Sequence, residues 1–156
     1  MERRTPNFAR ILAPATQKND GDFATLRGEE VDAVIELGFM MMNANGDASL
    51  DEIESFRALA KYLTPGADIA SLLDQYGDKL ARAESFESLV RAAAAKLTRQ
   101  TARELAYKAV YAVAVFDLET NEEERELEDL IVAVLRLDDA RAHDLALEAT
   151  KALSAS

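Results

Sequence analysis

The sequence predicts an all-α protein that folds as one compact helical bundle of about seven to eight helices. Three observations predict it. Ala and Leu dominate a composition with only three Pro and six Gly, and Ala, Leu, Glu and Arg lose little on entering a helix. Apolar residues recur at spacings of three and four, and no segment alternates with a period of two. The 156 residues suit a single domain with a sizeable core.

The first expected helix covers residues 29–42 and opens with two glutamates, which suit the positive end of a helix dipole. The turn at residues 43–47 ends this helix. A second helix then starts after Ser49, because Ser49 and Glu52 match a capping box, and it ends before Pro65.

A third helix is expected from about Asp68, and a fourth follows a cap at Ser85 or Ser88. The fifth, at about residues 101–116, is apolar on all its faces. We therefore expect it to be the central buried helix.

Asn121 is expected to cap a sixth helix, whose apolar residues recur at spacings of three and four. Asp138 and Asp139 precede a last amphipathic helix. The apolar residues assigned to that last helix are Leu145, Leu147 and Leu153.

Residues 1–28 mix proline, glycine and polar residues with one short apolar patch. This pattern predicts a flexible or loosely docked N-terminal segment that contributes nothing to the core. The helical domain is then expected at residues 29–153. The segment has five basic and three acidic side chains, so it could contact either an acidic partner or the acidic body of the protein itself.

The formal net charge is −11, from 18 basic and 29 acidic residues. Such a charge repels phosphate backbones and disfavours nucleic-acid binding, whereas cations and basic protein surfaces are suitable partners. The chain has no cysteine, which excludes disulfides and thiolate chemistry. No apolar run approaches the roughly 20 residues of a membrane helix, so we expect no direct membrane insertion. The early residues also lack a signal-peptide pattern, and a cytoplasmic location is expected.

Two acidic turns repeat along the chain. Residues 45–52 align with residues 117–124, a displacement of 72 residues. In both copies an apolar helix ends, a short acidic turn follows, and a cap starts the next helix. The sequence therefore predicts two pseudo-repeated helix–acidic turn–helix units within one bundle.

These turns resemble those of the tellurite-resistance TerB-like family, whose signature is Ala-Asp-Gly-x-x-Ser-x-x-Glu. Residues 44–52 match it except that Asn45 replaces the aspartate. Residues 114–124 match it with Leu118 in place of the glycine and Asn121 in place of the serine. The resemblance implies a non-enzymatic helical module of chemical stress responses that acts through protein partners, including membrane-associated complexes. It also implies acidic clusters that bind divalent cations, and Asn45 weakens this implication at the first turn.

Hard cations such as Ca²⁺ and Mg²⁺ prefer several carboxylate or carbonyl oxygens. No cofactor is required, but one of these ions could bind at the acidic turns. At the second turn, the competing interpretation is that Asp117 and Glu124 stabilise the turn and cap the helix, while the other acids form a solvated face. The candidate metal ligands are Asn45, Asp47, Asp51, Glu52, Asp117, Glu119, Glu123 and Glu124.

An alternative function is a calcium-responsive helix pair built on a degenerate EF-hand-like loop at residues 43–54. Against it, Ala48 stands where such loops need a glycine, and Asn43 removes a charge. Val115 in the second copy cannot ligate, so no paired loop exists. The ligands of this alternative loop are Asn43, Asn45, Asp47, Ser49, Asp51 and Glu54.

The remaining polar and soft residues favour no catalytic site. His143 is the only histidine and is expected at the surface. No serine lies in a nucleophile-elbow pattern, and no glycine loop suits a phosphate. Residues 40–42 are three methionines, for which we expect core filling with one exposed side chain rather than a partner-binding surface. The sequence thus predicts a protein that is not an enzyme.

Overall fold

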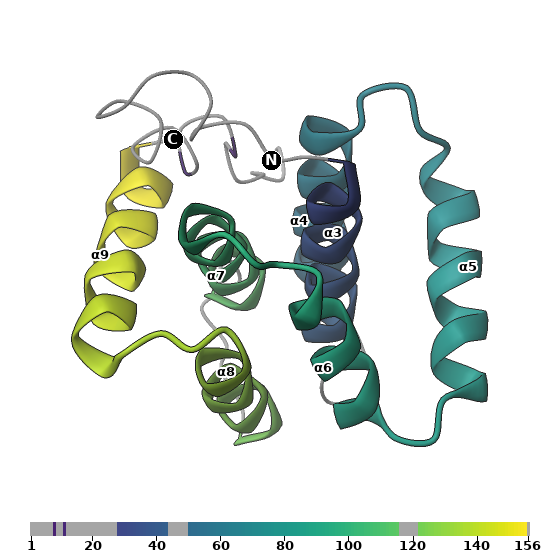
Figure 1. The fold of residues 1–156 in the computed structure, drawn as a ribbon. Coiled ribbons are helices and arrows are strands. Elements are labelled where there is room, and N and C mark those ends of the chain that lie inside the picture. Colours follow the sequence, from purple (N-terminus) through teal and green to yellow (C-terminus); the bar gives the residue numbers. More distant parts are fainter. Residues whose placement is uncertain (1–7, 9–10, 12–27, 44–49, 116–121, 156) are drawn as a thin grey trace.

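The computed structural model describes residues 8, 11, 28–43, 50–115 and 122–155, and every regular element in these ranges is an α-helix (Figure 1). The prediction of an all-α bundle is therefore confirmed. Both predicted helix–turn–helix units have their helices in the expected places. The helices are α3 (Gly28–Met42), α4 (Leu50–Leu63), α5 (Ile69–Arg82), α6 (Phe86–Ala95), α7 (Gln100–Val115), α8 (Glu122–Val134) and α9 (Asp139–Ala155).

Two helices form the centre of the bundle. As expected, α7 is buried along most of its length, and it packs against α3, α4, α8 and α9. The second central helix, α3, was not predicted as central from the sequence. It packs against α4, α5, α6, α7 and α8. Every residue of α3 from Ala33 to Met42 is buried. In Figure 1, α9 and α5 lie at opposite edges of the bundle, with the central helices between them.

The helix starts follow from capping side chains. A carboxylate oxygen of Asp68 accepts hydrogen bonds from the backbone N–H groups of Ala70 and Ser71, at 3.1 and 3.4 Å, and so caps α5. The choice between Ser85 and Ser88 is resolved in favour of Ser85, whose hydroxyl accepts from the N–H of Ser88 at 3.0 Å. These groups satisfy backbone donors that have no partner inside the helix, which explains why α5 and α6 begin at these positions.

The close approach of α3 and α4 depends on Gly38. A Cβ atom added at this glycine would lie 2.8 Å from the Cδ2 atom of Leu59, which is fully buried in α4. The aromatic ring of Phe39 meets that of Phe56 from α4 edge-on, with centroids 6.0 Å apart. The absence of a side chain at position 38 therefore lets the two helices interdigitate around these rings.

Helix α5 contains no fully buried residue, and two of its side chains, Tyr76 and Lys79, contact α3. The ring of Tyr76 lies 5.6 Å from that of Phe39, and the ammonium of Lys79 lies 3.1 Å from a carboxylate oxygen of Glu36. Burial, together with the nearby carboxylates of Asp32 and Glu36, raises the pKa of Tyr76 to about 12. Its hydroxyl therefore stays neutral at neutral pH, as a partly buried tyrosine requires.

Several side chains differ from the expectation. Phe8 and Ile11 are both buried in the core, so residues 1–28 do contribute to it. All three methionines at positions 40–42 are buried; core filling is confirmed, and the expected exposed member is wrong. The reason is that α3 packs against five other helices, namely α4, α5, α6, α7 and α8.

The apolar face assigned to the last helix is partly wrong. Leu147 is 46% exposed, whereas Leu145 is buried. Residues two apart on a helix point in different directions, so Leu145 and Leu147 cannot share one face. The buried face uses Ala142, Leu145 and Ala149 instead, at spacings of three and four. Among the described residues, no helix is long and apolar enough to cross a membrane.

Candidate functional site

Most of the predicted metal ligands cannot be compared with the structure. Five of them lie outside the described residues, namely Asn45, Asp47, Ser49, Asp117 and Glu119. Three more lie on described helices with side chains that are not described, namely Asp51, Glu123 and Glu124. The assignment of cation sites to the two acidic turns therefore stays a prediction. The structure describes the side chains of three candidate residues.

Asn43, Glu52 and Glu54 are those three residues. The side-chain amide nitrogen of Asn43 donates to the carbonyl oxygen of Phe39 at 3.0 Å, so Asn43 closes the last turn of α3. Glu52 lies in the first turn of α4 and is only 3% exposed, whereas Glu54 is half-buried. Glu52 is thus part of the packed interior.

The described residues contain no group of three or more His, Asp or Glu side chains arranged to hold a metal ion. His143 is exposed, as predicted. The acidic groups that the structure does bring together instead form ion pairs or gather on the surface.

Glutamates on α3 and α7 are used inside the fold. Glu30 is 3% exposed, and its two carboxylate oxygens accept from Arg99 at 2.6 and 2.9 Å. Glu104 on α7 makes an equivalent two-bond pair with Arg141 on α9, at 2.7 and 3.0 Å. The hydrogen bond from Arg141 is the largest influence that holds the pKa of Glu104 below its usual range. Such bidentate pairs fix geometry as well as charge, so these acids are structural.

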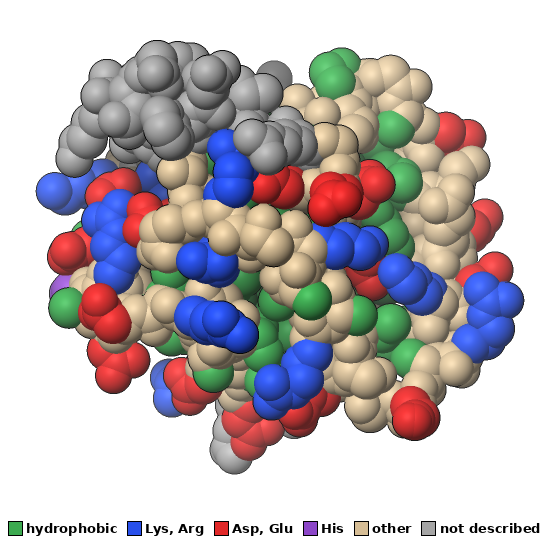
Figure 2. Space-filling view, viewed as in Figure 1, with side chains coloured by type: hydrophobic (Ala, Val, Ile, Leu, Met, Phe, Trp, Pro, Cys, Tyr) green, Lys and Arg blue, Asp and Glu red, His purple; other side chains and the backbone are tan. Residues whose placement is uncertain are grey.

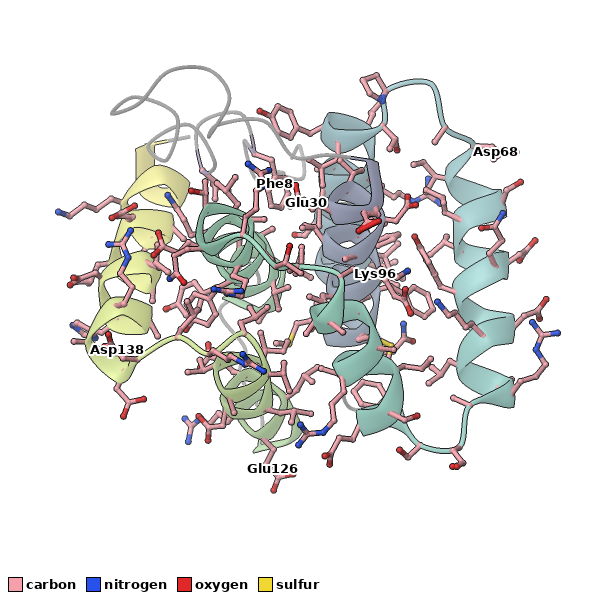
Figure 3. The ribbon with its side chains drawn as sticks, viewed as in Figure 1. Phe8, Glu30, Asp68, Lys96, Glu126 and Asp138 are labelled. Atoms are coloured by element: carbon pink, nitrogen blue, oxygen red, sulfur yellow. The ribbon has the colours of Figure 1, made fainter. Side chains whose placement is uncertain are left out.

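Five exposed acids lie on α8, on α9 or between them. Residues 117–148 contain twelve acidic and three basic side chains, so this fifth of the chain carries most of the net charge. Both helices pack against α7. Figure 3 shows the labelled Glu126 and Asp138 projecting outward from α8 and from the start of α9. We define the α8–α9 acidic surface by its exposed members, Glu126, Asp129, Asp138, Asp139 and Asp144.

None of these five carboxylates forms an ion pair with another described residue. Of the two basic side chains of α9, Arg141 pairs with Glu104 of α7 and is also attracted by Asp144, and the other is Lys151. The surface therefore keeps a net negative charge. Repulsion among like charges raises the electrostatic energy of such a surface, and a basic partner or a cation lowers it.

Glu128 shows this crowding most directly. It is half-buried on α8, and burial raises its pKa, with a further contribution from the adjacent Asp129. Arg125 opposes the shift. A positive group placed near Glu128 and Asp129 would favour the ionised form of Glu128.

Sequence reasoning missed both the buried charges and the position of the acidic surface. Lys108, which is 0% exposed, is the one charged residue in an otherwise apolar stretch of α7. Glu36 is likewise the one charge between Ala33 and Met42. A lone charge in a helix that is apolar on all faces is the signal that would have identified both. The concentration of acids in residues 117–148 was visible by counting along the chain rather than over the whole of it.

Comparison of the chain with protein-family models, with curated proteins and with solved structures gives no match. The resemblance to the TerB-like family therefore stays a prediction from the two turn motifs.

Proposed function

We propose that this protein is a non-enzymatic interaction module whose α8–α9 acidic surface binds a Lys- and Arg-rich segment of a partner protein. The single observation that supports the proposal is the net negative charge of that surface. Its five exposed carboxylates make no ion pair with a described residue, while the acids of α3 and α7 that face neighbouring helices are paired. Complementary charge speeds association and selects partners, which suits an interaction module.

The TerB-like resemblance supplies the rest of the proposal. It implies a role in a chemical stress response, with partners that include membrane-associated complexes, and it implies that Ca²⁺ or Mg²⁺ at the two acidic turns modulates binding. A cytoplasmic location is part of the proposal. A cation at the second turn would sit immediately before α8 in the chain, so it would lower the negative charge next to the proposed binding surface.

The test uses a peptide of alternating Lys and Ala residues as the basic partner, with binding measured by calorimetry at low and high salt. The double variant Asp129→Asn, Asp144→Asn removes two charges from the α8–α9 acidic surface. It is expected to weaken binding by about five- to tenfold at low salt. High salt is expected to weaken binding of the unaltered protein, because exposed charges are screened.

The matched control is Asp74→Asn, Asp78→Asn. Both residues are exposed on α5, at the opposite edge of the bundle from α9 (Figure 1), and the change in net charge is the same. This variant is expected to bind the peptide nearly as well as the unaltered protein. Equal weakening by the two double variants would mean that net charge alone attracts the peptide, and would contradict a specific surface.

A further inference from the structure

A pocket of about 330 Å³ lies where α6, α7 and α8 meet. One part of its wall is apolar and is formed by Ala94, Ala95 and Val134. The other part carries the side chains of Arg103 and Arg136, with Thr98 beside them. Two arginines in the lining of one small pocket are unexpected in a protein with a net charge of −11. Their positive charge favours a negatively charged ligand.

Arg103 is held in place by the backbone that surrounds it. One terminal nitrogen donates to the carbonyl oxygens of Leu97 and Thr98, at 3.3 and 2.9 Å, and the other donates to the side-chain oxygen of Gln100 at 2.9 Å. Its Nε atom is buried and has no hydrogen-bond partner in the structure. The three hydrogen bonds therefore hold the Arg103 guanidinium as a fixed positive charge in the wall of the pocket, where it attracts an anion.

Arg136 reaches the pocket from the end of α8. It is the only described non-glycine residue with a positive φ, at 59°. Its backbone N–H bonds to the carbonyl oxygen of Ala133 at 3.1 Å, and the N–H of Leu137 bonds to that of Val132 at 3.1 Å. Glycine or asparagine is usual at such a helix end, because a larger side chain in this conformation costs about 1 kcal/mol or more. Arg136 is exposed and forms no ion pair with a described residue.

The surroundings of the pocket contribute one more unpaired basic side chain. Of the other basic residues between positions 88 and 103, Arg91 pairs with Glu87 and Arg99 with Glu30, whereas Lys96 is exposed and forms no ion pair with a described residue. Figure 2 shows Lys and Arg side chains in a band across the middle of the face on which α6, α7 and α8 appear in Figure 1. Local positive charge of this kind raises the concentration of small anions near the pocket.

We propose that this pocket binds a small organic acid, with its carboxylate between Arg103 and Arg136 and its apolar body against Ala94, Ala95 and Val134. Guanidinium groups match the planar geometry of a carboxylate and bind it with charge-assisted hydrogen bonds. The volume is at the low end of the range for ligand pockets, which limits the ligand to a small molecule. The proposal is independent of the acidic surface, because it concerns a basic pocket and a different class of ligand.

Benzoate is the probe that tests this proposal, with benzamide as its neutral analogue and inorganic phosphate as an anion without an apolar body. Binding to the full chain is measured by calorimetry at low salt. Benzoate is expected to bind saturably, and benzamide and phosphate are expected to bind at least about tenfold more weakly. No binding of benzoate at millimolar concentration would overturn the proposal, and so would phosphate binding as tightly as benzoate.

Two variants locate the binding. Arg136→Asn removes one guanidinium and keeps a residue that tolerates the positive φ; it is expected to weaken benzoate binding about tenfold or more. Ala95→Phe keeps both arginines and fills the apolar part of the pocket from an exposed position; it is expected to abolish benzoate binding. The control is Arg82→Asn, an equal charge loss at an exposed position near the end of α5. Benzoate binding unaffected by either pocket variant, or weakened as much by Arg82→Asn, would overturn the proposal. Thermal unfolding of each variant verifies that it is folded.

Discussion

The ammonium nitrogen of Lys108 lies 2.9 Å from a carboxylate oxygen of Glu148, and this contact joins the central helix α7 to the edge helix α9. The two partners differ in exposure: the side chain of Lys108 is 0% exposed, whereas that of Glu148 is 38% exposed. The second carboxylate oxygen of Glu148 lies 3.9 Å from Arg141, which also pairs with Glu104. Four charges of alternating sign thus run along the interface between the two helices.

This asymmetry predicts unequal costs for removing each partner. Glu148→Ala leaves a buried ammonium without its carboxylate, and we expect a loss of about 3 kcal/mol of unfolding free energy. Lys108→Met replaces the buried charge by an apolar chain of similar length and leaves a partly hydrated glutamate, so a change within about 1 kcal/mol is expected. Urea unfolding at neutral pH measures both. Equal losses in the two variants would mean that the pair stabilises the fold as a simple symmetric contact.

Gly38 gives a second prediction, in which packing outweighs helix propensity. Gly38→Ala is expected to stabilise α3 by about 1 kcal/mol, because alanine has a higher helix propensity than glycine. The new methyl group would lie 2.8 Å from Leu59 Cδ2, and forcing extra volume into a packed core costs about 1–3 kcal/mol. We therefore expect a net loss of stability in thermal unfolding. The exposed Gly66 has no neighbouring atom near an added Cβ, so Gly66→Ala is the control for the clash. A Gly38→Ala protein more stable than the unaltered one would show that α3 and α4 separate without cost.

Glu128 predicts a pH dependence with a defined sign. Its pKa is raised in the folded protein, chiefly by burial. Ionisation of Glu128 therefore opposes folding, and the resulting loss of stability develops as the pH rises from its unfolded pKa through its folded pKa. Glu128→Gln removes this loss, so it is expected to raise the unfolding midpoint at pH 7 relative to its effect at about pH 4. A benefit that is larger at the lower pH would contradict the assignment.

The two acidic turns predict a response to hard cations. If Ca²⁺ or Mg²⁺ binds the folded protein alone, a concentration of about 100 times the dissociation constant adds about 2.7 kcal/mol of stability. This should raise the unfolding midpoint of chelator-treated protein by several degrees. Loss of the shift in Asp117→Asn would assign the ion to the second acidic turn. If the shift occurs with Ca²⁺ alone and is lost in Glu54→Gln, the ion is assigned to the EF-hand-like loop. No shift with any ion would exclude both sites.

The positions of the helices could be predicted because they depend on short-range chemistry. Ser85 caps α6, as its position before the helix indicates. The helices of the α3–α4 and α7–α8 pairs lie where capping residues and apolar spacing predict them. Such signals lie within a few residues of the feature that they determine.

Burial of individual side chains could not be predicted in the same way, because it depends on which helices surround a given face. Phe8 and Ile11 are buried although their segment has no long apolar pattern. Lys108 and Glu36 are buried because partners from α9 and α5 reach them. These partners lie 40 and 43 residues away in sequence, beyond the reach of any local pattern.

The pocket between α6, α7 and α8 is another product of distant residues. Arg103 and Arg136 come from different helices, and neither belongs to a recognisable motif. Only the positive φ of Arg136, together with the position of Arg103 beside it, identifies the site.

The most direct test of the central claim is a nuclear magnetic resonance titration of isotopically labelled protein with the peptide of alternating Lys and Ala residues. We expect backbone signals of α8 and α9 to shift saturably, with the largest changes near Asp129 and Asp144, and those of α5 to stay in place. The shifts should disappear at high salt. Shifts spread evenly over all the exposed acids, or concentrated on α5, would contradict the assignment of the α8–α9 acidic surface as the binding site.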